Sequence, residues 1–128
     1  MWQLLGSWQN GRVVVNLYKA AQWVWLERTR GGKTKGFGLP AERLIYLAAA
    51  VVTAAIAPPS EVVRGPLPVA MVDGEDRTLT ISWEPYNFGT TNALIIRKQS
   101  DRSIAVEQSD VKDFAWWLLS HAARTCAV

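Results

Sequence analysis

The 128-residue chain has very few of the side chains from which metal and catalytic sites are built. It contains one cysteine, Cys126, and one histidine, His121. A single cysteine excludes a disulfide within these residues, and the pair cannot supply the ligands of a zinc site. A nucleotide-binding loop is also missing, because Gly36-Phe37-Gly38 is only a fragment of a dinucleotide fingerprint. We therefore predict that the protein is not an enzyme and has no cofactor and no bound metal.

Long apolar runs are also lacking. The uncharged stretch 44–57 is about two-thirds of the roughly 20 residues that a membrane span needs, and Pro58 and Pro59 follow it. We expect a buried helix there. The first residues lack the basic start and apolar run of an export signal. Together with the single cysteine, this predicts a cytoplasmic protein with no membrane partner.

The chain is rich in tryptophan and uneven in charge. It has seven tryptophans, of which Trp116 and Trp117 lie in a helical pattern. At least one of these two is expected to close the core, and packing of both is favoured over a partner contact for the other. Residues 1–64 carry eight basic and three acidic residues, a net charge of +5, whereas residues 65–128 carry six and eight, a net charge of −2. This asymmetry favours a polyanionic partner for the first half.

The order of the predicted elements occurs twice. Alternating β-forming residues and turn signals predict eight strands, at 2–9, 12–19, 22–28, 34–39, 69–73, 77–84, 93–98 and 102–107. Helical spacing predicts helices over 41–57 and 111–124, the second capped by Ser109-Asp110. Asn10-Gly11 is expected to form the first hairpin turn, and the proline-rich segment 58–68 to be a linker.

The two halves also match residue by residue. At an offset of 67 the apolar helix face that begins at Leu44 falls on the one that begins at Val111, and Arg28 meets Arg97 at an offset of 69. Such a repeat predicts two copies of one unit that bury their apolar faces against each other. We therefore expect a single α+β domain, 1–128, with repeat one at 1–57, a linker at 58–68 and repeat two at 69–128. Its two ββββα repeats would form a pseudo-symmetric unit of two four-stranded antiparallel sheets and two packed helices.

The stretch VWLERTRGGKTKGFGLPAERLIYL resembles a known nucleic-acid-binding family. A strand ending in arginine, a basic glycine-rich turn, a Gly-Phe-Gly-Leu return and an apolar helix are similar to the single-stranded-DNA-binding domain of the transcriptional coactivator positive cofactor four, whose relatives include the Whirly and Pur-alpha-like proteins. The local motif covers residues 12–51, and the ββββα topology covers nearly the whole chain. The resemblance implies a fused dimer whose strands present a curved surface to single-stranded DNA or RNA.

Aromatic and basic side chains gather around this motif. Bases stack on aromatic rings, and cationic grooves follow the phosphates of a single strand. Trp23 and Trp25 would share one strand face beside a basic turn, although they are equally suited to the core. The predicted nucleic-acid-binding residues are Arg12, Tyr18, Lys19, Trp23, Trp25, Arg28, Arg30, Lys33, Lys35, Tyr86, Phe88, Arg97, Lys98 and Arg102.

Three functional hypotheses remain from the sequence. The first is largely sequence-independent binding of single-stranded DNA, or also RNA, in transcription, replication, recombination or repair. The alternative is a protein-interaction or assembly module that keeps the fold without binding nucleic acid. Duplex recognition is a third hypothesis, but both predicted helices look buried and offer no recognition helix. In each case the fused pair could associate further with itself.

Overall fold

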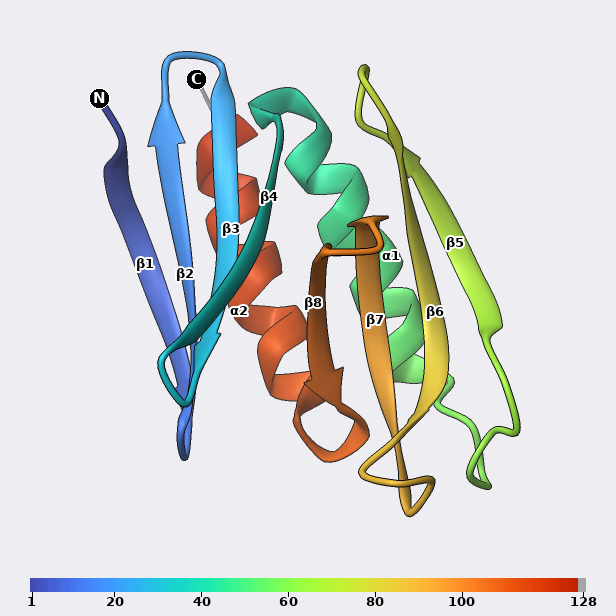
Figure 1. Ribbon diagram of the computed structural model, residues 1–128. Helices are drawn as coiled ribbons and strands as arrows, with labels where there is room; N and C mark the ends of the chain where they lie inside the picture. The colour runs from blue at the N-terminus through green and yellow to red at the C-terminus, as the bar shows by residue number, and fades with distance from the viewer. Residues whose placement is uncertain (127–128) are drawn as a thin grey trace.

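The computed structural model, which describes residues 1–126, has two sheets on one side and two helices on the other (Figure 1). The first sheet has the order β1-β2-β3-β4 and the second the order β5-β6-β7-β8, and neighbouring strands are antiparallel. The elements of the first half are β1 (Gln3–Asn10), β2 (Val13–Ala20), β3 (Trp23–Arg30), β4 (Lys33–Pro40), the 3-10 turn η1 (Ala41–Arg43) and α1 (Leu44–Ile56). Those of the second half are β5 (Leu67–Asp73), β6 (Thr78–Tyr86), β7 (Thr91–Gln99), β8 (Arg102–Glu107) and α2 (Gln108–Cys126). The predicted α+β class, with a helix after each four-stranded sheet, is confirmed.

Several elements begin at another residue than predicted; α1 begins at Leu44 and not at residue 41, and β7 begins at Thr91 and not at residue 93. β5 begins at Leu67, inside the predicted linker. Pro68 is tolerated there because β5 lies at the edge of its sheet and its pairing with β6 shifts between Pro68 and Ala70. α2 begins at Gln108, immediately after β8, so the predicted cap at Ser109-Asp110 lies inside the first turn of the helix.

The first hairpin turn also differs from the prediction. Asn10 is the last residue of β1 and pairs with Val13, so the two turn residues are Gly11 and Arg12. Gly11 has a φ of 58°, a left-handed conformation that glycine adopts without steric cost. The turn is therefore one residue further along than Asn10-Gly11, and Arg12 lies at its tip.

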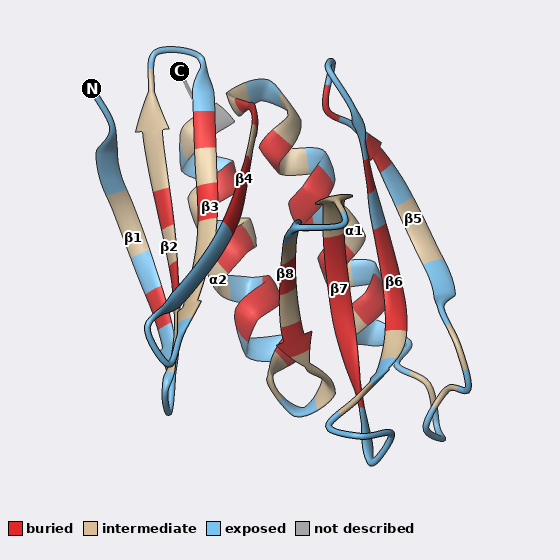
Figure 2. Cartoon of the chain, in the orientation of Figure 1, coloured by how far each residue is buried: buried red, intermediate tan, exposed pale blue. Residues whose placement is uncertain are grey.

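Each sheet buries one apolar face. Val24 and Leu26 of β3 pair with Leu39 and Phe37 of β4, and all four side chains are fully buried. In the second sheet the equivalent cross-strand pairs are Leu94 with Val106 and Ile96 with Ile104. The helices cover these faces with buried residues at helical spacing: Leu44, Leu47 and Val51 from α1, and Val111, Phe114 and Leu118 from α2 (Figure 2). All of these residues belong to one hydrophobic core.

The helices connect the two halves of the chain. They pack against each other, α1 packs against β5 of the second sheet, and α2 packs against β1 of the first as well as against β7 and β8. Trp8 of β1 shows the second contact in detail: its indole Nε1 donates to Asp113 Oδ2 at 2.9 Å, and its ring meets Phe114 edge-on at 5.3 Å. The adjoining sheet edges are β4 and β8, which also pack together. Neither half is thus an independent body.

The apolar run at 44–57 forms the expected buried helix. α1 has 13 residues, ends before Pro58, and turns a face of leucine, alanine and valine into the core. Within residues 1–126, none of the helices combines the length and apolar character needed to cross a membrane.

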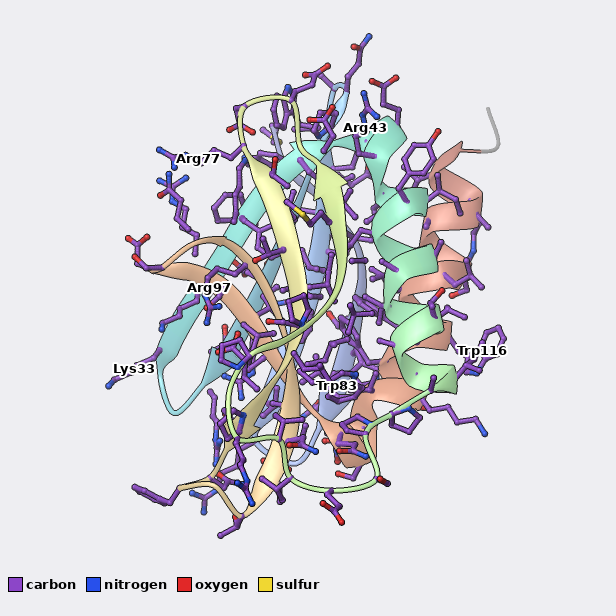
Figure 3. All side chains as sticks on the ribbon, turned by 90° about the vertical axis from the view of Figure 1, so that its right-hand side faces the viewer. Lys33, Arg43, Arg77, Trp83, Arg97 and Trp116 are labelled. Atoms are coloured by element: carbon purple, nitrogen blue, oxygen red, sulfur yellow. The ribbon has the colours of Figure 1, made fainter. Side chains whose placement is uncertain are left out.

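The two adjacent tryptophans of α2 have different environments. Trp117 packs beside Phe114 and against His121, with ring centroids 5.6 and 5.2 Å apart. Trp116 is 55% exposed and lies on the helix side of the molecule (Figure 3). The expected packing is confirmed for Trp117 and wrong for Trp116, because neighbouring residues on a helix point in different directions.

His121 makes the stability of the fold sensitive to pH. Burial, and secondly the charge of Arg124, lower the pKa of its imidazole below the ordinary value. The unfolded chain therefore takes up a proton first as pH falls, and the free energy of unfolding should decrease below about pH 6.5. Urea denaturation at pH 7.5, 6.5 and 5.5 measures this loss, which should be smaller in His121→Gln. An equal loss in both proteins would contradict the assignment.

Candidate functional site

The two faces of β3 carry different chemistry. Trp23 and Trp25 lie on the face away from the core; Trp23 is 39% exposed and Trp25 is half-buried. Arg28 and Arg30 alternate with them and share the face of the buried Leu26, beyond the end of the core. The expectation that the two tryptophans and the basic turn form one surface is therefore wrong.

Four cations lie together at the end of the β3–β4 hairpin. Arg28 is directly opposite Lys35, and Arg30 is directly opposite Lys33, so all four side chains share one face. Gly31 and Gly32, with φ of 58° and 76°, form the turn between the strands. We call Arg28, Arg30, Lys33 and Lys35 the basic hairpin. Across residues 1–126, none of the four has a carboxylate within 4.0 Å.

The basic hairpin meets an aromatic loop of the second sheet. Arg28 Nη2 and Arg30 Nη1 lie 3.3 and 3.5 Å from the hydroxyl oxygen of Tyr86, at the end of β6. Two residues later, the ring of Phe88 is fully exposed at a left-handed φ of 57°. This conformation costs a bulky side chain roughly 1–2 kcal/mol. Tyr86, which the sequence placed with the second copy, is therefore the aromatic side chain that contacts the basic turn, whereas Trp23 and Trp25 lie on the other face of β3.

A cleft of about 220 Å³ lies beside this contact. Its charged lining comes from both sheets and from α2, and comprises Arg12, Arg28, Arg30, Glu107 and Asp110. The two carboxylates accept hydrogen bonds from the amides of Asn87 and Asn10. The Nε of Arg28 is buried and has no hydrogen-bond acceptor within the described part of the chain. The cleft therefore brings three arginines and two carboxylates together, and none of these arginines has a carboxylate within 4.0 Å in residues 1–126.

Arg97 and Lys98, in contrast, are engaged within the protein. Arg97 binds Glu84 through two nitrogens, at 2.8 and 3.3 Å. Burial tends to raise the pKa of Glu84, but the hydrogen bonds and charge of Arg97 outweigh it, so the pKa is lowered. The Nζ of Lys98 is 2.7 Å from the carbonyl oxygen of Gly38 and 2.9 Å from the carboxylate of Asp76, and the side chain is only 5% exposed. The charges of Arg97 and Lys98 are therefore neutralised by Glu84 and Asp76, respectively.

The sequence match between Arg28 and Arg97 fails in the structure. Arg28 shares the core face of β3 with Leu26, whereas Arg97 lies on the opposite face of β7 from the buried Ile96. Lys98, one residue later, has the orientation of Arg28. Like Arg28 it reaches the other sheet, where its Nζ also lies 5.9 Å from the centre of the Trp23 ring.

The remaining predicted residues are divided between the ends of the molecule. Arg12, at the β1–β2 turn, lines the cleft beside the basic hairpin. Lys19 pairs with Val24 at the far end of β2, and Arg102 is exposed at the start of β8 opposite Gln99. Neither is gathered with the basic hairpin.

Arg77 is a basic residue outside the predicted set. It lies on the side of the molecule opposite the helices, as Lys33 and Arg97 do (Figure 3). It is exposed and follows the acidic cluster of the β5–β6 turn.

A second site lies on the outer face of the first sheet. An open pocket of about 370 Å³ is lined by Trp2, Tyr18, Trp25 and Glu27, which we call the aromatic pocket. The Glu27 carboxylate accepts hydrogen bonds from the Tyr18 hydroxyl and the Trp25 Nε1, each at 3.1 Å. Loss of hydration, followed by this hydrogen bond and the charge of Glu27, raises the pKa of the Tyr18 phenol. Trp2 and Glu27 were not predicted, although the period of two along β3 already places Glu27 on the face of Trp25.

The Gly-Phe-Gly motif makes room for this pocket. Gly36 and Gly38 lie on the outer face of β4, directly opposite Glu27 and Trp25. A Cβ on Gly38 would be 3.4 Å from the Trp25 ring, and one on Gly36 would be 2.6 Å from the Leu26 carbonyl oxygen and 2.8 Å from Glu27 Cβ. Gly36 is therefore a structural requirement of the sheet surface, whereas a Cβ on Gly38 would make an ordinary contact with the Trp25 ring.

Gly36→Ala should destabilise the protein. The added methyl group meets backbone that can move only if the β3–β4 pairing is distorted, so we expect a loss of about 1–3 kcal/mol in the free energy of unfolding. Gly65→Ala is the control, because a Cβ there meets no atom within 4 Å. Urea denaturation compares the two variants with the wild type. Equal stability of the three proteins would show that β4 is not packed as described.

Comparison with known proteins gives no assignment. The sequence matches no known protein family. It also matches no curated protein sequence. The geometry of the basic hairpin and its aromatic neighbours is the basis for the function proposed next.

Proposed function

We propose that this protein binds single-stranded DNA, and also RNA, with little sequence preference. Phosphates would lie along the basic hairpin and Arg12, and bases would stack on Tyr86 and Phe88. The observation that carries the proposal is the set of four cations on one hairpin face, unpaired with any carboxylate in residues 1–126, which meets an aromatic loop at Tyr86.

The charge arrangement supports an anionic ligand. Like charges directly opposite each other on neighbouring strands destabilise a sheet, and the basic hairpin has two such pairs, Arg28 with Lys35 and Arg30 with Lys33. Arg97 on the second sheet is neutralised by Glu84, whereas the basic hairpin has no carboxylate within 4.0 Å in residues 1–126. A phosphate between the paired cations would relieve their repulsion.

The aromatic loop supports a single strand over a duplex. An exposed ring can stack only on a base whose face is free, which a duplex does not offer. Phe88 is held in solvent by a strained backbone, with no core contact to offset the cost. Both helices turn their apolar faces into the core, so neither is suited to enter a major groove.

We also propose that the two halves form a pseudo-symmetric pair, as the internal repeat predicts. Two reciprocal relations support it. α1 packs on β5, the first strand of the second sheet, and α2 packs on β1, the first strand of the first sheet. Arg28 reaches from β3 to Tyr86, and Lys98 reaches from β7 to Gly38. Only the first copy gathers four basic side chains on one hairpin face with no carboxylate within 4.0 Å in residues 1–126, so nucleic-acid binding would be asymmetric within this pair.

Binding of a labelled oligothymidine should weaken steeply as salt rises, because bound cations release condensed counterions. Arg30, Lys33 and Lys35 are exposed, and changing all three to alanine should lower the affinity. The slope of log K against log salt should become shallower by about 2, since each phosphate contact contributes roughly 0.7 on a single strand. Fluorescence anisotropy at several salt concentrations measures both effects.

The control for this experiment changes the same amount of charge elsewhere. Arg64, Lys112 and Arg124 are also exposed and lie outside the basic hairpin. The corresponding triple alanine variant should retain most of the slope. If the wild type binds no oligothymidine in a salt-dependent way, the nucleic-acid proposal is wrong and the protein-interaction alternative gains support. Preference for a duplex in the same assay would favour the third hypothesis.

Phe88→Ala tests the stacking half of the proposal. Loss of one stacked base should weaken oligothymidine binding by about 1–3 kcal/mol, with no change in the salt slope, because no charge is removed. Trp116→Ala removes an exposed ring from the helix side, where Trp116 is 55% exposed, and should bind as the wild type does. Unchanged affinity of Phe88→Ala would remove the aromatic loop from the binding surface.

A further inference from the structure

The aromatic pocket has a charge opposite to that of the basic hairpin. Its only ionisable side chain able to carry a charge near neutral pH is Glu27, between the rings of Tyr18 and Trp25. Arg28 and Arg30 follow on the same strand but point to the other face. A phosphate would meet a carboxylate here, so the nucleic-acid proposal does not account for this pocket.

The carboxylate of Glu27 has no cationic partner of its own. Within residues 1–126, no Lys, Arg or His nitrogen lies within 4.0 Å of it. Its two hydrogen bonds come from neutral groups, the Tyr18 hydroxyl and the Trp25 indole, and the side chain is half-buried. A carboxylate that has lost part of its hydration without gaining a counter-charge is a favourable site for a cation.

The shape of the pocket selects among cations. A metal ion prefers several oxygen ligands, and this pocket supplies one carboxylate among aromatic rings. Trp2 and Trp25 are inclined at 55° with their centres 6.5 Å apart, so a flat nucleobase could stack on one ring but could not lie between the two. Two inclined rings beside a third fit a compact, roughly spherical group. The volume of the aromatic pocket, about 370 Å³, lies within the range of small-molecule sites, ~300–1,000 Å³.

We propose that Trp2, Tyr18, Trp25 and Glu27 form a binding site for an alkylammonium cation, such as a free quaternary amine or a methylated lysine side chain. The aromatic faces would attract the cation through their quadrupoles, and Glu27 would neutralise its charge. This site lies on the outer face of the first sheet, apart from the basic hairpin, and does not depend on nucleic-acid binding.

Choline is the first probe, and 3,3-dimethyl-1-butanol, which has the same shape without the charge, is the comparison. NMR titration of the indole N–H signals should show binding of choline in preference to the neutral alcohol. Glu27→Gln should weaken choline binding about five- to thirtyfold. Glu61→Gln makes the same chemical change at an exposed position outside the pocket and should have no effect. A trimethyllysine peptide, titrated alongside, distinguishes a protein ligand from a free amine by its higher affinity.

Trp2→Ala provides a second test, because Trp2 precedes β1, is 49% exposed and lies outside the core. It should weaken choline binding without unfolding the protein. The proposal is overturned if neither choline nor the peptide binds, if the neutral alcohol binds equally well, or if Glu27→Gln binds as the wild type does. Glu27→Gln should also keep wild-type oligothymidine affinity. A loss there would identify the pocket as part of the nucleic-acid surface, whereas failure of oligothymidine binding alone would leave the cation site standing.

Discussion

The rest of the structure depends on one constraint: α1 and α2 cover one face of the two sheets. The inward side chains of β3 and β4, such as Leu26 and Phe37, are fully buried, and the same face continues beyond the core as Arg28 and Lys35. Burial of a cation without a counter-charge is costly, so the strands must extend past the helices before charge can appear on this face. The basic hairpin is thus an extension of the core face into solvent, where it meets the second sheet.

The same alternation gives the first sheet two surfaces of opposite character. The face continuous with the core ends in four cations, and the outer face carries tryptophans around Glu27. Gly36 and Gly38 leave β4 bare under these rings. An anionic ligand and a cationic ligand could therefore occupy one sheet without competing, each excluded from the other's surface by charge.

The sequence predicted the architecture well because apolar periodicity reports burial directly. All eight strands, both helices and the α+β class follow from alternation and helical spacing, with errors at boundaries such as Leu67 and Gln108, where strand pairing overrides local signals. The site was predicted less well. Which residues meet across the two sheets, as Arg28 and Tyr86 do, depends on how the sheets are placed by the core, and that is not encoded in local spacing. The sequence match between Arg28 and Arg97 failed for a simpler reason. An offset between the two repeats that is wrong by one residue places the side chain on the opposite face of the strand.

The contact between β1 and α2 has a consequence for synthesis. Trp8 and Asp113 are joined by a hydrogen bond across 105 positions of the chain, and β1 has a neighbouring strand on one side only. During translation β1 therefore emerges long before the helix that covers it. Contacts of such long range slow folding, and an uncovered outer strand can pair with other chains in the meantime. Until α2 has been translated, β1 therefore lacks the helix that covers it and keeps one strand edge open to pairing with other chains.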